Sequence, residues 1–258
     1  MNTIPATPLR DTSPTPAGVR EEIDLTIFIP CLNEEKRVVP TLETVRAAMA
    51  ELTLSYEVIA VDDGSTDRTA GVIEEYCRAH PDMPVCLHKN PRNLGLSRSF
   101  VDTAFRGRGR YYRLVCGANV EPKDSMVKIL RFIGTTDIII PYYPVLPGKS
   151  RGRKFISNLY TRIVDLLSGY RIKYYNGCAL YRRFHVMRWA SYNYGFGFQA
   201  HLITTLLDEG ASHIEMPLKG FHLAKDRGSP LNLRNFLSTG HTLHEIFIRR
   251  LRRVIYKN

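Results

Sequence analysis

Hydrophobic residues in the first half of the chain form short runs that alternate with helical stretches. Runs rich in β-branched and aromatic residues predict buried parallel strands at residues 24–30, 56–65, 83–90 and 111–118. Apolar positions with helical spacing recur between them at residues 34–52, 67–80 and 95–108. This alternation, with its short connections, predicts an α/β fold with a doubly wound, mostly parallel sheet flanked by helices.

The second half of the chain is less regular. Helical periodicity returns at residues 155–170 and 196–210, and residues 212–221 are typical of a further strand. The first 22 residues are rich in Pro, Thr and Ser, which predicts a disordered tail. Because no repeat and no linker follow residue 23, we expect three parts: the tail at 1–22, one domain at 23–235 and a C-terminal helix at 236–258.

The predicted C-terminal helix has two chemically different sides. Apolar residues fall on one side, at Leu243, Phe247, Leu251, Val254 and Ile255. Arginines fall on the other side, at Arg249, Arg252 and Arg253. This arrangement suits a helix that lies in an anionic membrane surface. The alternative is a helix packed on the domain with a solvated basic side.

The composition is that of a globular protein with a strong positive charge. The 258 residues are 44% hydrophobic and 24% charged, and no apolar run reaches the roughly 20 residues that span a bilayer. The N-terminus has no apolar core of a secretory signal, and the five scattered cysteines favour the reducing cytosol. The formal net charge of +11 indicates an anionic partner. Without a helix-turn-helix, RNA-recognition or zinc motif, we expect that partner not to be nucleic acid.

Polar clusters lie at the predicted strand ends, where doubly wound sheets bind their ligands. The clusters are Asn33 with Glu34, Asp62 with Asp63, Asn93 with Gly95, and Asn119 with Glu121. Asp62 and Asp63 are adjacent, so their side chains point to opposite sides of a strand. One can meet a ligand while the other braces the turn that follows. A well-capped turn alone would also explain "DDGSTD", but Glu34 and Asn93 at the same edge favour a binding site.

Three motifs in order, "IPCLNEE", "VDDGSTDRT" and "NLGLSRS", resemble the start of a family 2 glycosyltransferase with the GT-A fold. The stretches "RGRKFISNLYTRIVDLLSGYRIKYYNGCALYRR", "GFGFQAHLI" and "EMPLKGF" are similar to the dolichol-phosphate mannose synthase branch. The resemblance implies an inverting transferase that moves a sugar from a UDP- or GDP-linked donor to a polyprenyl phosphate. Transfer to a glycan hydroxyl in polysaccharide assembly, and donor binding without catalysis, remain as alternatives.

The resemblance also implies which residues bind the nucleotide. Pro30, Glu34 and Asp63 would line its pocket, and Asn93 and Gly95 would lie beside the base and ribose. Asn93 capping the next helix is an equally good explanation. The wider set of expected donor-binding residues is Pro30, Asn33, Glu34, Asp62, Asp63, Asn93, Gly95 and Arg98. Arg98 would contact a phosphate, or else it lies on a solvated helix face.

The family's metal motif is changed in this sequence. The resemblance implies two aspartates that hold Mg²⁺ or Mn²⁺ against the diphosphate, but Gly117 and Asn119 stand at their positions. Hard cations prefer oxygen ligands, so Asn119 and Glu121 would form a weakened site. Arginines in place of a metal, and an inactive protein, are the alternatives.

The acceptor side of the predicted site is basic. The resemblance places Arg151 and Arg153, within "GKSRGRK", near the phosphate of a lipid, and Gln199 at a matching position. Lys173 departs from the family pattern, which leaves the sugar or acceptor undefined. The expected catalytic residues are Asn119, Glu121, Arg151, Arg153 and Gln199.

No general base stands out in the sequence, although Asp208, Glu209 and Glu215 are candidates. A hydroxyl acceptor must lose a proton to attack, whereas a lipid phosphate is already ionised. The sequence therefore favours a phosphate acceptor. We expect a cytoplasmic protein that is peripheral to the membrane's cytoplasmic face, with an integral-membrane protein as a further partner left open.

Overall fold

The computed structural model describes residues 22–144, 151–189, 195, 197–219 and 233–256. The predicted tail at residues 1–22 lies outside this set, apart from Glu22. The strands of the seven-stranded sheet are β1 (Ile23–Cys31), β2 (Tyr56–Asp62), β3 (Val85–Lys89), β4 (Gly109–Leu114), β5 (Ile138–Tyr142), β6 (Leu180–Arg182) and β7 (His213–Pro217). The helices are α1 (Val38–Met49), α2 (Thr69–Ala79), α3 (Leu96–Arg106), α4 (Lys123–Leu130), α5 (Arg151–Ser168), α6 (Arg183–Trp189), α7 (Phe198–Asp208) and α8 (Leu233–Ile255).

The sheet has the strand order β3-β2-β1-β4-β6-β5-β7. The four strands predicted from the first half pair in parallel, and β7 pairs in parallel with β5. The short strand β6 runs antiparallel to β4 and β5. The predicted doubly wound, mostly parallel α/β sheet is therefore confirmed, and β5, β6, α4 and α6 are additions that the sequence reading did not include.

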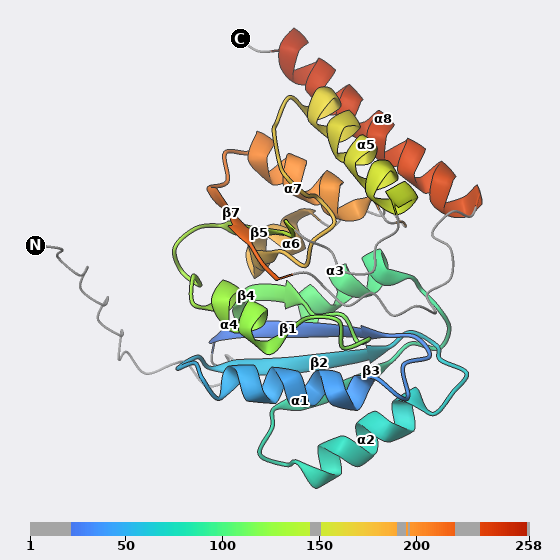
Figure 1. The fold of residues 1–258 in the computed structure, drawn as a ribbon, viewed down its shortest axis with the longest axis vertical. Helices are drawn as coiled ribbons and strands as arrows, with labels where there is room; N and C mark the ends of the chain where they lie inside the picture. Colours follow the sequence, from blue (N-terminus) through green and yellow to red (C-terminus); the bar gives the residue numbers. More distant parts are fainter. Residues whose placement is uncertain (1–21, 145–150, 190–194, 196, 220–232, 257–258) are drawn as a thin grey trace, which may run out of the picture.

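Alternate residues of the central strands face two separate cores, as a strand with both faces covered requires. One face of β1 packs Leu25, Ile27 and Ile29 into a core with residues of α1, α2 and α4. The opposite face packs Phe28 into a core with residues of α3, α6 and α7. Figure 1 shows α1 and α2 on one side of the sheet, with α5, α7 and α8 towards the other end of the molecule. This layering leaves the carboxyl ends of β1, β2 and β4 free to carry a site.

Helices α5 and α8 pack against each other, and α8 also packs against α7. Helix α8 begins at Leu233, three residues before the boundary expected from the sequence, and its Ile246 is buried in the core with α7. Among the described helices, none combines the length and hydropathy that crossing a bilayer requires.

Candidate active site

The loop after β1 is tied to the turn after β2. Asn33, which has a positive φ of 56°, accepts a hydrogen bond on Oδ1 from the Thr66 amide at 2.9 Å. Its own amide donates to Ser65 Oγ at 2.9 Å. Asn33 tolerates this left-handed conformation better than most side chains, and its local hydrogen bonds stabilise it. The two segments thus form one rigid corner beside Pro30.

Glu34 is nearly buried at this corner. Its Oε2 accepts a hydrogen bond from Arg37 Nε at 2.6 Å, and its amide donates to Thr69 Oγ1 at 2.8 Å. Among the described residues, none bonds to Oε1, so this oxygen can accept a hydrogen bond from a ligand. Cys31 lies directly before the corner, and burial, with the nearby charge of Glu34, raises the pKa of its thiol far above the ordinary value. That thiol is therefore not a nucleophile.

Asp62 and Asp63 both brace the chain. Asp62 Oδ1 accepts from the Ser65 amide at 3.0 Å. Asp63 Oδ1 accepts from Asn90 Nδ2 at 2.7 Å and from the Leu94 amide at 2.9 Å. Its Oδ2 accepts from the Gly95 amide at 3.0 Å. Asp63 therefore holds the loop between β3 and α3, while Asp62 keeps one oxygen without a bond to any described residue.

The third predicted cluster, Asn93 with Gly95, lies in the loop that Asp63 holds. Asn93 is exposed, and its backbone packs so closely on Gly64 that a Cβ there would lie 2.7 Å from the Asn93 nitrogen. Gly95 has a φ of 89° and is the N-cap residue of α3, so Asn93, two residues earlier, does not occupy the capping position. Arg98 donates Nε to Asp102 Oδ2 at 2.7 Å, one turn along the helix. These residues reach the same edge as Asn33, Glu34 and Asp62, as predicted.

The changed metal motif is attached to α1. Thr41 Oγ1 accepts from the Asn119 amide and lies 2.9 Å from the Gly117 carbonyl oxygen. The Asn119 side chain turns to α1, where its Oδ1 lies 3.1 Å from Thr44 Oγ1. Asn119 also has a positive φ of 49°, which Asn tolerates well.

Glu121 faces the interior and forms an ion pair with Arg113. The distance from Arg113 Nη2 to Glu121 Oε1 is 2.5 Å, and the two side chains are 0% and 2% exposed. Burial alone would lower the pKa of the Arg113 guanidinium, but the Glu121 carboxylate raises it above the ordinary value. The sequence reading missed Arg113. A charged residue between the apolar residues Tyr112 and Leu114, eight residues before a glutamate, was the signal that could have found it.

On the acceptor side, Arg151 and Arg153 belong to the first turn of α5, so the basic stretch starts the helix and does not only precede it. Their side chains lie outside the described set. Gln199 lies in the first turn of α7, where its Oε1 is buried without a partner among the described residues. Lys173 binds Glu215 through its backbone amide at 2.6 Å and lies over the Tyr142 ring.

The carboxylates considered as general bases are all engaged elsewhere. Asp208 binds Arg249 and Arg253, Glu209 binds Arg188, and Glu215 binds the backbone and side chain of Lys173. Each of these carboxylates therefore already has a basic partner in the structure.

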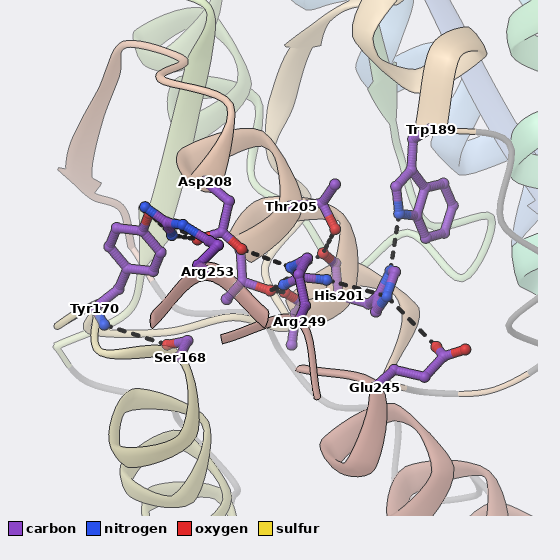
Figure 2. Close-up of polar contacts among 11 residues, drawn as sticks. Ser168, Tyr170, Trp189, His201, Thr205, Asp208, Glu245, Arg249 and Arg253 are labelled. Atoms are coloured by element: carbon purple, nitrogen blue, oxygen red, sulfur yellow. Dashed lines mark hydrogen bonds and ion pairs between the residues drawn. The ribbon is translucent and has the colours of Figure 1, made fainter. Parts of the chain in front are cut away.

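Figure 2 shows the polar network in which Asp208 takes part, between α7 and α8. Arg249 donates to Asp208 Oδ2 at 2.6 Å. It also donates to Thr204 Oγ1 at 2.5 Å. Trp189 Nε1 donates to His201 Nδ1 at 2.9 Å. Burial, together with the nearby Arg249 charge, lowers the pKa of His201 to about 4. Arg249, expected on a solvated or lipid-facing side of the last helix, thus faces the domain, which corrects that expectation for Arg249; Arg253 pairs with Asp208 but stays exposed.

The sequence model described as "Glycosyl transferase family 2" matches residues 26–188, more than half of the chain. The chain belongs to glycosyl transferase family 2. The family match confirms the resemblance carried by the three N-terminal motifs, and it covers the strand ends described above.

Among solved structures, a mannosyltransferase from Pyrobaculum calidifontis in complex with GDP-mannose and Mn²⁺ superposes with a TM-score of 0.61 at 16% identity. It covers 90% of this chain and 65% of its own. Glucosyl-3-phosphoglycerate synthase from Mycobacterium tuberculosis, in complex with Mn²⁺, UDP and glucosyl-3-phosphoglycerate, gives a TM-score of 0.63 at 16% identity, covering 87% and 80%. These likenesses confirm the GT-A fold.

Curated relatives share shorter stretches. A dolichyl-phosphate beta-glucosyltransferase from Trichomonas vaginalis is 27% identical over 168 residues, which are 59% of this chain and 49% of the relative. A dodecaprenyl-phosphate galacturonate synthase from Rhizobium johnstonii is 34% identical over 116 residues, 43% of this chain and 33% of the relative. The matched stretches thus cover half or less of these relatives' own length.

Proposed function

We propose that this family 2 protein is an inverting glycosyltransferase that moves a sugar from a UDP- or GDP-linked donor to the phosphate of a polyprenyl lipid. The observation that carries the proposal is the engagement of Asp208, Glu209 and Glu215 in pairs with basic groups. A hydroxyl acceptor needs a base to remove its proton, and a phosphate acceptor does not. The names of the Trichomonas and Rhizobium relatives, which contain a dolichyl phosphate and a dodecaprenyl phosphate, support the same acceptor class.

The donor would lie against the corner formed after β1 and β2. Asp62 and Glu34 each keep an oxygen without a described partner, and such oxygens suit the N–H and O–H groups of a base and a ribose. Pro30 and the 93–95 loop would line the same pocket. Asp63 acts here as a positioning residue, because its hydrogen bonds shape that loop. Arg98 would reach a phosphate only by leaving Asp102.

The acceptor phosphate would lie near the start of α5. Arg151 and Arg153 supply guanidinium groups whose planar donors match phosphate oxygens. The buried Gln199 Oε1, which has no described partner, is an acceptor available to a sugar hydroxyl. Both assignments extend the sequence predictions for these residues.

The proposal also places the protein on the cytoplasmic face of an anionic membrane as a peripheral protein. Exposed apolar residues line the adjacent helices α5 and α8: Phe155, Ile156, Leu159, Leu166, Phe247, Leu251, Val254 and Ile255. The acidic residues of these helices, Asp165 and Glu245, are half-buried and interact with Tyr175 and His201. Exposed cations, by contrast, include Lys154, Arg162 and Arg252. An exposed apolar surface, with exposed cations beside it and acidic residues turned towards the domain, suits binding to anionic lipid.

A turnover assay tests the proposed reaction. UDP-, GDP- and dTDP-linked sugars are each combined with a polyprenyl phosphate, the corresponding polyprenol or an oligosaccharide. We expect product with the phosphate alone, and Arg153→Ala should raise the KM for it by about tenfold, as loss of one charged hydrogen bond does. Arg171→Ala, at an exposed position, is the matched control.

Two other results would replace the proposal. Product with the oligosaccharide alone would favour transfer to a glycan hydroxyl. Donor binding without turnover on any acceptor would favour a non-catalytic binding protein, a candidate that Gly117 and Asn119 in the metal motif support.

A further inference from the structure

Polar groups at both Gly117 and Asn119, in the segment 117–121, are bonded to side chains of α1. Thr41 holds the backbone at Gly117 and Asn119, and the Asn119 side chain lies against Thr44. The segment is therefore fixed on α1 by the protein alone.

The charged member of the segment, Glu121, is held in the core by Arg113. One carboxylate oxygen lies 2.5 Å from Arg113 Nη2, and the other oxygen and Arg113 Nη1 are both buried without a described partner. These two remaining atoms are an acceptor and a donor of the same ion pair, which allows a second bond between the two groups. Arg113 also donates Nε to the Cys178 carbonyl at 3.3 Å. One guanidinium thus links the altered metal motif to the loop before β6.

These residues do not fit a divalent cation of the kind that the family resemblance implies. A Cβ at Gly117 would lie 2.7 Å from the Pro30 carbonyl oxygen, so an aspartate there needs the backbone to move. Freeing Glu121 would leave a buried guanidinium without its counter-charge, which is strongly unfavourable. In the described part of the chain, no group of three or more His, Cys, Asp or Glu is placed to hold a metal ion.

We propose that Arg113 has taken the place of the divalent cation as the partner of Glu121, and that this protein binds its nucleotide-sugar donor without a metal ion. The inference rests on the proposed donor. Charge on the departing diphosphate would then be balanced by basic side chains, for which the first turn of α5 carries Arg151, Arg153 and Lys154. The earlier prediction that Asn119 and Glu121 hold Mg²⁺ or Mn²⁺ is the competing hypothesis.

The first test measures donor affinity of the full chain by calorimetry, in EDTA and in millimolar Mn²⁺. We expect the Kd of the bound UDP- or GDP-sugar to agree within about twofold between the two conditions. If Mn²⁺ tightens donor binding tenfold or more, the inference is overturned. If no nucleotide sugar binds in either condition, the proposed function fails instead, and the second test decides the inference.

The second test needs no donor, because it measures thermal unfolding in EDTA. Glu121→Gln should lower Tm by roughly 6–20 °C, since it leaves Arg113 buried without a counter-charge. An open metal ligand would behave oppositely, so an unchanged or higher Tm would overturn the inference. Arg113→Met/Glu121→Met removes both charges and should recover most of the loss, even if the single variant does not fold. Glu51→Gln is the control, because Glu51 pairs with Lys123 at an exposed position.

Discussion

At the scale of single residues, Asp63 shows how a motif can mark the right place while its side chain does a different task. The sequence placed it at the edge of the sheet and expected nucleotide contact. The structure shows both of its oxygens occupied by the loop at 90–95. Asp62, its neighbour, keeps an oxygen free of described partners. Adjacent acids on a strand divide their work, but the sequence alone did not determine which acid does which.

Replacing these acids separately tests that division. Asp63→Ala removes three bonds to half-buried donors and should lower the free energy of unfolding by about 2–4 kcal/mol, along with donor affinity. Asp62→Ala removes one hydrogen bond within the protein and should lower the free energy of unfolding by about 1 kcal/mol, while donor affinity still falls. Urea unfolding and calorimetry on both variants measure the two effects. If Asp63→Ala leaves stability unchanged but abolishes donor binding, Asp63 contacts the nucleotide directly and does not merely position the loop.

His201 makes stability depend on pH in a direction that its environment sets. Its pKa is lowered to about 4 by burial and by Arg249, so the folded state resists protonation. The unfolded chain protonates near its ordinary value of about 6.5. Stability is therefore complete above about pH 6.5 and is lost as the pH falls towards 4, by about 2 kcal/mol at pH 5.

Urea unfolding at pH 7.5 and pH 5.0 checks this for the wild type and His201→Gln. Glutamine can still accept from Trp189, and the comparison cancels the titration of Asp208, Glu245 and His241 nearby. The variant should lose about 2 kcal/mol less on acidification than the wild type. Equal losses would show that His201 already titrates at its ordinary value in the folded protein.

At the scale of elements, the sequence predicted β1 to β4, α1 to α3 and the longer later helices, and missed β5, β6, α4 and α6. Strands β1 to β4 are apolar runs, and such runs can be recognised locally. Strand β6 has three residues and forms only between β4 and β5. The buried Arg113–Glu121 pair similarly joins a strand to a loop, and the arginine in the strand is a local signal that does not by itself identify its partner. Periodicity in α8 revealed two sides but not which one meets the domain.

Helix α8 is held by its arginines, and this gives a prediction about docking. Arg249→Met should lower the free energy of unfolding by about 2–4 kcal/mol, because Asp208 loses a charged partner in a partly buried site. Arg252→Met, at an exposed position of the same helix, should change it by less than about 0.5 kcal/mol. Urea unfolding compares the two. Equal effects would mean that the contacts in Figure 2 do not hold the helix in solution.

At the scale of the whole molecule, the charge of +11 and the apolar surface on α5 and α8 would both favour binding to an anionic membrane. Electrostatic attraction to anionic lipid is screened by salt, whereas apolar contact is not. The surface is assembled from two helices far apart in sequence. Deleting the segment from residue 242 onward would be a poor test, because Thr242 and Ile246 are buried.

Point substitutions on the surface therefore test membrane binding better. Leu166→Ser/Leu251→Ser/Val254→Ser should reduce sedimentation with anionic liposomes at least tenfold, since three exposed apolar side chains are lost. Phe132→Ser, at an exposed position beyond α4, should leave sedimentation unchanged. If the wild-type protein does not sediment with the liposomes, the membrane proposal is wrong. An integral-membrane protein would then be the candidate that covers this surface.

The tight contact at Gly117 also limits the routes by which sequences of this kind can change. The Cβ of an aspartate at 117 would lie too close to the Pro30 carbonyl oxygen. At 119, the side chain and the backbone amide are already bonded to Thr44 and Thr41. Neither single substitution restores a working pair of ligands, and the one at 117 also starts from a less stable protein. A lineage with this arrangement would have to change β1, Arg113 and the motif together before selection could favour the return. Loss of the acids at 117 and 119 would therefore be easier in evolution than their return.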